Sequence, residues 1–138
     1  MLLRQHHDLS WWEKEERELA PLSRIPPWFI MVLSQIRLFM IKHIVVWKLK
    51  ESAEGCSKIE NAKKMKAMLE SLQSVIKEIQ YIEVGLNFNP SEAAYDIALY
   101  SEFQSREALE IYQKHPEHVK VAEFVGKVRL ERKVVDYE

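Results

Sequence analysis

The sequence predicts an α+β domain with the element order β-α-β-β-α-β. Apolar residues repeat with a period of two in the segments predicted as strands and with a period of three to four in those predicted as helices, and capping residues separate the segments. The 138 residues are 47% hydrophobic and 30% charged, with three glycines and five prolines, a composition typical of one globular domain. The 20 basic and 21 acidic residues nearly balance, so neither nucleic acid nor an anionic membrane is an expected partner.

Cys56 is the only cysteine of the chain. A single cysteine excludes an intrachain disulfide and a cysteine-based zinc site, and it fits a reducing compartment, so we expect a cytoplasmic protein. The apolar run Trp28 to Leu33 is much shorter than the roughly 20 residues that a membrane-spanning helix needs. It also lies too far from the start for a secretory signal.

Residues 1–39 differ from the rest of the chain. They hold three of the four tryptophans and show no sustained hydrophobic period. Pro26 and Pro27 predict an extended stretch there. We therefore place a domain boundary before Met40, and expect an extension that is disordered or precedes the true translation start, at Met31 or Met40. An arm that docks on a partner is the alternative.

Residues 40–49 are predicted to form the first strand, because they are β-branched and aromatic and alternate regularly. Ile41, His43 and Val45 share one side, and Ile44 and Val46 share the other. A strand that is apolar on both sides is expected to be covered on both sides.

A helix of about five turns should follow, because Ser57-x-x-Glu60 forms a capping-box pattern. Its apolar residues recur every three or four positions: Ile59, Ala62, Met65, Leu69, Leu72 and Ile76.

Strands are predicted at residues 79–86 and 95–103, separated by a loop with an Asn-Pro pair. Ser105 caps a short helix that must break before Pro116, which suits the first position of the next helical piece. Gly126 is expected to end that piece in a left-handed conformation. Residues 131–137 supply the last strand.

This order is the ferredoxin-like βαββαβ arrangement, a four-stranded antiparallel sheet. Right-handed crossovers place the helices on one face of that sheet. The other face would expose Ala98 and Tyr100 together with the second apolar side of the first strand. We expect a second copy of the chain to cover it, forming a homodimer.

Six sequence fragments, in the same order, resemble the stress-responsive A/B barrel (Dabb) family from Met40 to the end of the chain. The fragments are Ile41-Lys42-His43-Ile44-Val45, Glu83-Val84-Gly85, Tyr95-Asp96, Phe103-x-Ser105-x-Glu107-Ala108-Leu109, Tyr112-x-x-His115-Pro116-x-His118 and Val135-Asp136-Tyr137. The resemblance implies a dimeric α/β barrel, with a small pocket between the sheet and helices of each subunit.

One branch of that family looks like a polyketide cyclase that closes a ring by aldol condensation. The resemblance makes His118 the base and Tyr112 the group that polarises a carbonyl, while His43 shapes the pocket. Leu69 stands where that branch has a pocket tyrosine, so a different substrate is expected. Val45 and His115 complete the predicted substrate-binding residues.

His118 also stands out without the resemblance. It lies two residues after Pro116, where a helix start disfavours the imidazolium form, so it should remain neutral and available as a base. A structural histidine on the apolar face is the equal alternative. The pair His115-x-x-His118 does not indicate a metal site, because Pro116 interrupts the helical spacing and no further ligand completes a set. No cofactor motif is present.

Two functions remain open. The first is a cofactor-free cyclase, lyase or isomerase that acts on a small apolar carbonyl ligand through His118 and Tyr112. The second is a non-catalytic homodimer that contributes to stress tolerance or binds a ligand. An open pocket reaching His118 would favour the first function, and a solid interior the second.

Overall fold

The computed structural model describes residues 25–138. The chain divides into two compact units, residues 1–37 and 38–138. The helix α2 (Pro27–Leu38), all but the last residue of which belongs to the first unit, begins directly at Pro27. This differs from the predicted extended stretch, because proline is well tolerated in the first turn of a helix. Residues 1–24 of the predicted extension lie outside the described residues, and the boundary before Met40 stays a prediction.

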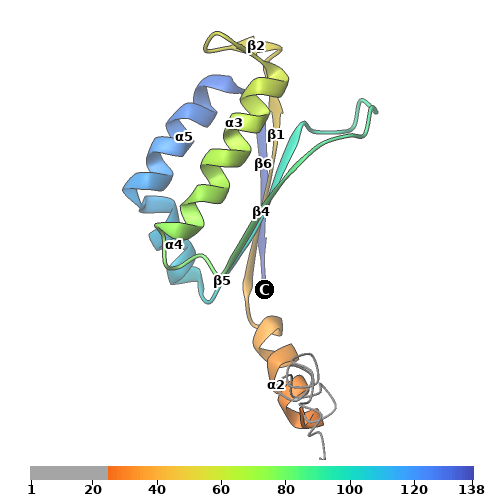
Figure 1. Cartoon of the computed structure of the whole chain (residues 1–138), viewed down its shortest axis with the longest axis vertical. Coiled ribbons are helices and arrows are strands. Elements are labelled where there is room, and N and C mark those ends of the chain that lie inside the picture. The colour runs from red at the N-terminus through yellow and green to blue at the C-terminus, as the bar shows by residue number, and fades with distance from the viewer. Residues whose placement is uncertain (1–24) are drawn as a thin grey trace, which may run out of the picture. The chain divides into compact units, whose positions relative to one another are not determined.

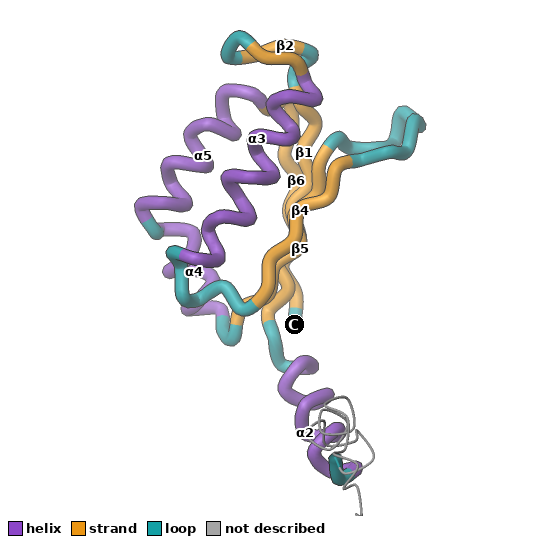
Figure 2. Tube along the Cα trace, in the orientation of Figure 1, coloured by secondary structure: helices purple, strands orange, loops and turns teal. Residues whose placement is uncertain are grey.

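The second unit contains a four-stranded antiparallel sheet with the helices on one side of it (Figures 1 and 2). Its strands, in the spatial order β4-β5-β1-β6, are β4 (Tyr81–Leu86), β5 (Ile97–Phe103), β1 (Ile41–Leu49) and β6 (Arg129–Tyr137). Its helices are α3 (Lys58–Ser71), followed by the 3₁₀ turn η2 (Leu72–Ser74), α4 (Arg106–Lys114) and α5 (Pro116–Val128). The predicted β-α-β-β-α-β order and ferredoxin-like α+β fold are confirmed.

Two strands of two residues each form a hairpin before α3, where the sequence predicted no strand. The strands β2 (Ser52–Ala53) and β3 (Cys56–Ser57) pair around Glu54 and Gly55, whose φ angles are 51° and 74°. The Asn61 side chain donates a hydrogen bond from Nδ2 to the Ala53 carbonyl oxygen at 3.0 Å. This bond ties the hairpin to the first turn of α3.

The capping box predicted for α3 is present. The Ser57 hydroxyl accepts a hydrogen bond from the Glu60 amide, and the Glu60 carboxylate accepts one from the Ser57 amide at 2.8 Å. The Ser57 amide and the Ser57 hydroxyl, the latter at 2.9 Å, both donate hydrogen bonds to the Glu60 carboxylate and hold the pKa of Glu60 below its usual range. Ile59 does not join the buried face and is 55% exposed. Asn61 takes the buried position of the first turn instead.

Two side chains of α3 bind the outer edge of β4. The Lys66 ammonium donates a hydrogen bond to the Val84 carbonyl oxygen, and the Glu70 carboxylate accepts one from the Val84 amide at 3.2 Å. Lys66 and Glu70 also form an ion pair at 2.7 Å. The Lys66 ammonium lowers the pKa of the Glu70 carboxyl, so both backbone groups of Val84 have charged partners.

The ends of α4 and α5 follow the predicted caps, with one exception. The Ser105 hydroxyl accepts a hydrogen bond from the Ala108 amide at 3.1 Å, and α5 starts at Pro116 as predicted. Gly126 does not end α5, which continues to Val128. The left-handed conformation predicted for Gly126 is therefore wrong. Its φ is not positive, and the backbone amide of Arg129 still bonds to the Val125 carbonyl oxygen.

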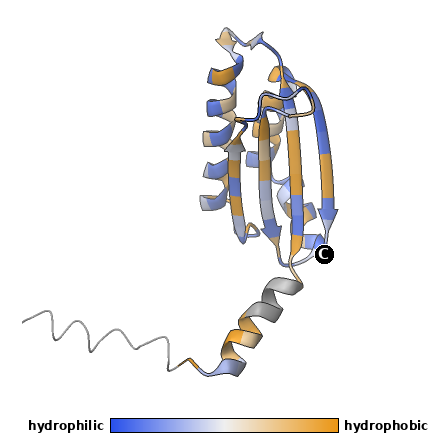
Figure 3. Ribbon diagram, turned by 90° about the vertical axis from the view of Figure 1, so that its right-hand side faces the viewer, coloured by the Kyte–Doolittle hydropathy of each residue, from blue (hydrophilic) through white to orange (hydrophobic). Residues whose placement is uncertain are grey.

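The two faces of the sheet differ in cover. On the helix side, Val84, Leu99 and Val45 form a buried row across β4, β5 and β1. Ile44 and Val46 belong to the opposite face by alternation along β1. The helices α3, α4 and α5 do not cover this face, because they lie behind the sheet in Figure 3. Within residues 25–138, no helix is long and apolar enough to cross a bilayer.

Candidate functional site

His43 on β1 faces the helices and is 3% exposed. Its position in the strand predicted this orientation, because it alternates with the buried Ile41 and Val45. Its Nδ1 is hydrogen-bonded to the carboxylate of Asp136, which lies directly opposite on β6. When His43 is neutral, this bond places the proton on Nδ1 and the lone pair on Nε2.

Tyr112 lies on α4 and is fully buried. Its ring centroid is 4.9 Å from that of Phe103 and 4.4 Å from that of His118. Among the described residues, its hydroxyl has no hydrogen-bond partner. Burial raises the pKa of Tyr112 far above its usual value, against a smaller lowering effect of the Arg132 charge. The hydroxyl therefore keeps its proton and is a free donor.

His118 is the half-buried third residue of α5. Its Nδ1 lies 3.0 Å from the backbone carbonyl oxygen of Gln113, which can only accept, so Nδ1 carries the proton. Burial lowers the pKa of His118, and the charges of His43, Arg132 and His115 lower it further, while the Gln113 carbonyl raises it. His118 is accordingly neutral near pH 7, with its lone pair on Nε2.

The structure brings three of the predicted site residues into one cluster. The ring centroid of Tyr112 is 6.2 Å from that of His43 and 4.4 Å from that of His118. His115 has a different role at the start of α5, where its Nδ1 accepts a hydrogen bond from the Glu117 amide at 3.1 Å. The remaining two, Val45 and Leu69, are buried in the hydrophobic core.

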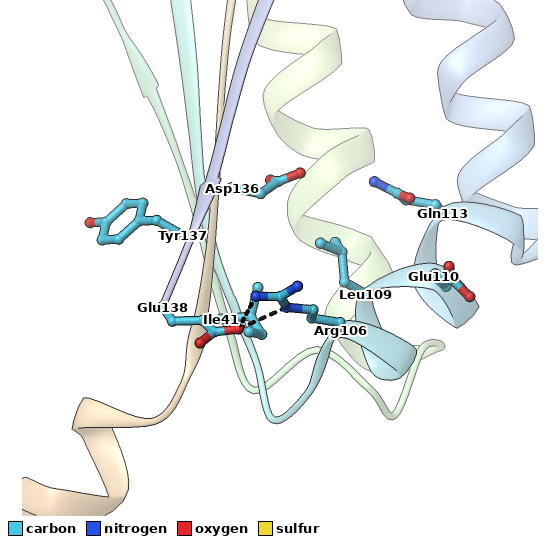
Figure 4. Close-up of a pocket in the computed structure, with 8 residues that line it drawn as sticks. All are labelled: Ile41, Arg106, Leu109, Glu110, Gln113, Asp136, Tyr137 and Glu138. Atoms are coloured by element: carbon cyan, nitrogen blue, oxygen red, sulfur yellow. Dashed lines mark hydrogen bonds and ion pairs between the residues drawn. The ribbon is translucent and has the colours of Figure 1, made fainter.

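A pocket of about 550 Å³ lies beside the hydrogen-bond partners of this cluster. Figure 4 shows the residues that line it. Its lining comes from α4, the start of β1 and the end of the chain: Ile41, Arg106, Leu109, Glu110, Gln113, Asp136, Tyr137 and Glu138. Asp136 and Gln113 are the hydrogen-bond partners of His43 and His118. The pocket thus reaches the partners of both histidines, but the histidines themselves are not among its lining residues.

The helix-facing side of β6 is exposed along its length. Arg132, Val134 and Asp136 alternate on this side, opposite the buried Trp47, Val45 and His43 of β1. We call these three side chains the open β6 face. Tyr137 projects from β6 to the opposite side of the sheet from Asp136 (Figure 4).

Sequence reasoning missed Asp136, Gln113 and Arg132 as site residues. Asp136 belongs to the Val-Asp-Tyr fragment at the last strand, and its alternation with Val134 could have placed it on the helix side. Nothing in the sequence singles out Gln113, because it contributes only a backbone carbonyl to His118.

The cluster does not form a metal site. Within residues 25–138, no three His, Cys, Asp or Glu side chains lie close enough together to hold a metal ion. The Nδ1 atoms of His115 and His118 bond to separate backbone groups. The cluster offers a neutral imidazole lone pair beside a protonated hydroxyl, and neither group has a hydrogen-bond partner within residues 25–138.

The fold and the cluster define a small ferredoxin-like domain with a lateral pocket. The chain belongs to the Dabb family, the stress responsive A/B barrel domain, whose family model matches residues 41–138. This confirms the resemblance found in the sequence. No curated protein matches significantly.

Solved structures share this fold. A dimeric protein with a ferredoxin-like fold from Bacteroides fragilis is 40% identical, with a TM-score of 0.65, and the match covers 72% of this chain and 95% of that chain. A Dabb family protein from Mesorhizobium loti is 25% identical, with a TM-score of 0.57 and the same coverage of 72% and 95%. A hydroxynitrile lyase from Passiflora edulis, 21% identical with a TM-score of 0.59, covers 71% of this chain and 91% of its own, and shares the fold.

Proposed function

We propose that this protein is a cofactor-free lyase, isomerase or cyclase that binds a small carbonyl compound and removes a proton next to its carbonyl group. His118 is the base in this proposal and Tyr112 the hydrogen-bond donor. The observation that carries it is the contact between the two rings, whose centroids are 4.4 Å apart. Among the described residues, neither the His118 Nε2 lone pair nor the Tyr112 hydroxyl proton has a partner.

The proton moves in one step. The C–H bond next to the carbonyl breaks, His118 Nε2 takes the proton, and the electron pair moves onto the carbonyl oxygen. The Tyr112 hydroxyl donates a hydrogen bond to that oxygen, because its raised pKa keeps it protonated. The resulting enolate can then attack a second carbonyl, lose a leaving group or accept a proton at another carbon.

His43 and Asp136 support the pocket wall in this proposal. The Asp136 carboxylate fixes the His43 ring by binding Nδ1, so the other nitrogen points in a constant direction. His43 lies 6.2 Å from Tyr112 between ring centroids and contributes positioning.

The assay is exchange of protons for deuterium at the carbon next to a carbonyl, followed by proton NMR with a panel of simple ketones. The wild-type protein is expected to accelerate exchange of at least one ketone. His118→Gln should lower that rate by about 100-fold or more, the usual contribution of a general base. His115→Asn is the matched control, because it replaces the other histidine of the fragment by a residue that still caps α5.

A single observation favours binding without catalysis as the second candidate. The 550 Å³ pocket is lined by the partners of His43 and His118 rather than by the rings themselves. If no ketone exchanges faster with the wild-type protein than with His118→Gln, while ligands still bind, the catalytic proposal fails and this second function remains.

We also propose that the bare face of the sheet joins two copies of the chain. Ile44, Tyr100 and Val135 occupy one row of this face, and Val135 is 60% exposed in the single chain. Val135→Lys should convert a dimer to a monomer in sedimentation, because it puts a charge into the interface. Val134→Lys is the control on the other side of the same strand and should remain dimeric.

A further inference from the structure

Arg132 is a cation on the open β6 face, and it has no ion-pair partner in the part of the chain that the structure describes. It lies directly opposite the buried Trp47 in the antiparallel pair, so both side chains are on the helix side of the sheet. The adjacent acid, Glu131, is on the other side and accepts a hydrogen bond from the Tyr95 hydroxyl at 2.9 Å.

Two buried donors on the helix side of the sheet have no partner either. The Tyr112 hydroxyl and the Trp47 indole Nε1 are both buried without an acceptor among the described residues. Buried polar groups are costly unless something satisfies them. The charge of Arg132 lowers the pKa of Tyr112 and of His118, so the guanidinium is electrostatically coupled to both.

The Arg132 guanidinium and the Trp47 indole can only donate hydrogen bonds, and the Tyr112 hydroxyl has a proton to donate, so a ligand that satisfies them needs acceptor oxygens. We propose that the compound bound here is an oxo carboxylate, with its carboxylate on Arg132 and its carbonyl oxygen on the Tyr112 hydroxyl. This inference rests on the proposed function and names its substrate class. It replaces the wholly apolar ligand expected from the sequence by a ligand with one charged end.

The charge around Arg132 favours a carboxylate over a phosphate. A guanidinium binds the two oxygens of a carboxylate through two parallel hydrogen bonds. A phosphate dianion would meet a single cation here, while Asp136 lies on the same side of the strand, four residues and about 13 Å away. Val134, between the two, offers apolar contact to the carbon chain of the ligand.

Three probes test the inference by ligand-observed NMR titration of the full-length protein. They are 4-oxopentanoate, its methyl ester, and hydroxyacetone phosphate. The oxo acid is expected to bind at least about tenfold more tightly than the ester, the size of one charge-assisted hydrogen bond. Arg132→Gln should remove that difference and leave ester binding within about twofold, while Arg132→Lys should retain part of it.

Arg129→Gln is the matched control, because it removes an exposed arginine from the same strand. The inference is overturned if the oxo acid binds no better than the ester, if Arg129→Gln weakens it as much as Arg132→Gln, or if hydroxyacetone phosphate binds most tightly. Deuterium exchange separates the two proposals. Arg132-dependent binding of the oxo acid without any exchange would sink the catalytic function and leave the charged binding site in place.

Discussion

On the helix side of the sheet, the part formed by β4, β5 and β1 is covered and the part formed by β6 is open. Apolar residues alternate along the strands in both parts, but their side chains end in different environments. One row of apolar side chains crosses β4, β5, β1 and β6: Val84, Leu99, Val45 and Val134. The first three are 2%, 1% and 1% exposed, whereas Val134 is 44% exposed. Alternation along a strand decides which side a residue faces, but the helices decide whether that side is closed.

The site lies on the line between these two parts. His43 pairs with Asp136 and Trp47 with Arg132, and in each pair the β1 residue is buried and the β6 residue is exposed. A buried group next to an exposed charged group gives a ligand both a surface shielded from water and access from solvent. The candidate site therefore lies beside β6, where both kinds of group meet, rather than under α3.

The largest expected effect comes from truncating the covered part of the row. Leu99→Ala should lower the free energy of unfolding by about 2 to 5 kcal/mol, because it leaves a cavity among packed side chains. Val134→Ala should cost less than about 1 kcal/mol, since the side chain is 44% exposed. Urea unfolding measures both, and equal costs would mean that something covers β6 in solution.

Asp136→Asn tests the contact between the covered β1, through His43, and the open β6. The variant removes the charged acceptor of His43, and we expect a loss of about 1 kcal/mol, reduced by solvent because the Asp136 side chain is 41% exposed. Urea unfolding is again the measurement. Glu110→Gln, at another acid of the pocket rim, is the control and should be neutral. If Asp136→Asn leaves the free energy of unfolding unchanged, the carboxylate is not needed to hold the His43 ring.

Tyr112→Phe should change stability in the opposite direction. The hydroxyl is buried without a partner, so its removal takes away an unsatisfied group and should raise the free energy of unfolding by up to about 1 kcal/mol. Thermal melting measures this change, and the exchange assay should lose activity in the same variant. A destabilised Tyr112→Phe protein would instead reveal a partner for the hydroxyl in the folded protein.

The smallest expected effect is on the pH dependence of stability. The folded pKa of His118 is lowered, mainly by burial, so the unfolded chain binds its proton more readily. The contribution of His118 to stability is present above its ordinary pKa of about 6.5 and is lost as the pH falls through the lowered value. His118→Gln should flatten this part of the profile of melting temperature against pH.

Arg132→Gln tests the cause of the lowered His118 pKa directly. In NMR titration, the pKa of His118 should rise in this variant, because the Arg132 charge is one of the groups that lower it. Arg129→Gln should leave the titration of His118 unchanged. A His118 pKa that does not move would place the Arg132 guanidinium too far from the cluster to act on a shared ligand.

Much of the fold could be read from local patterns. The capping box at Ser57 and Glu60, the break at Pro116 and the alternation around His43 each act within a few residues, and all appear as predicted. Gly126 was misjudged because a glycine near a helix end is only a weak stop signal when the following residues continue the helix. The β2–β3 hairpin was missed because two-residue strands leave no alternation to detect.

The candidate site was harder to predict because its contacts join distant segments. That His43 faces inward follows from period two, but its pairing with Asp136 depends on the strand order and register of the folded sheet. In the sequence, Arg132 is one of several charged residues of an alternating strand. Its proposed role in ligand binding depends on the helices leaving β6 uncovered. Composition and spacing carry no information about that cover.

The bonds from Lys66 and Glu70 to Val84 have a consequence for self-assembly. They occupy the outward backbone groups of an edge strand, which are the groups that another extended chain would use to add itself to the sheet. A charged pair at that position makes strand addition at β4 unfavourable, because an incoming chain would have to displace both bonds. Molecules that associate in a crowded solution are thus directed away from open-ended sheet growth at this edge, and the proposed contact between two copies through the uncovered face of the sheet does not compete with it.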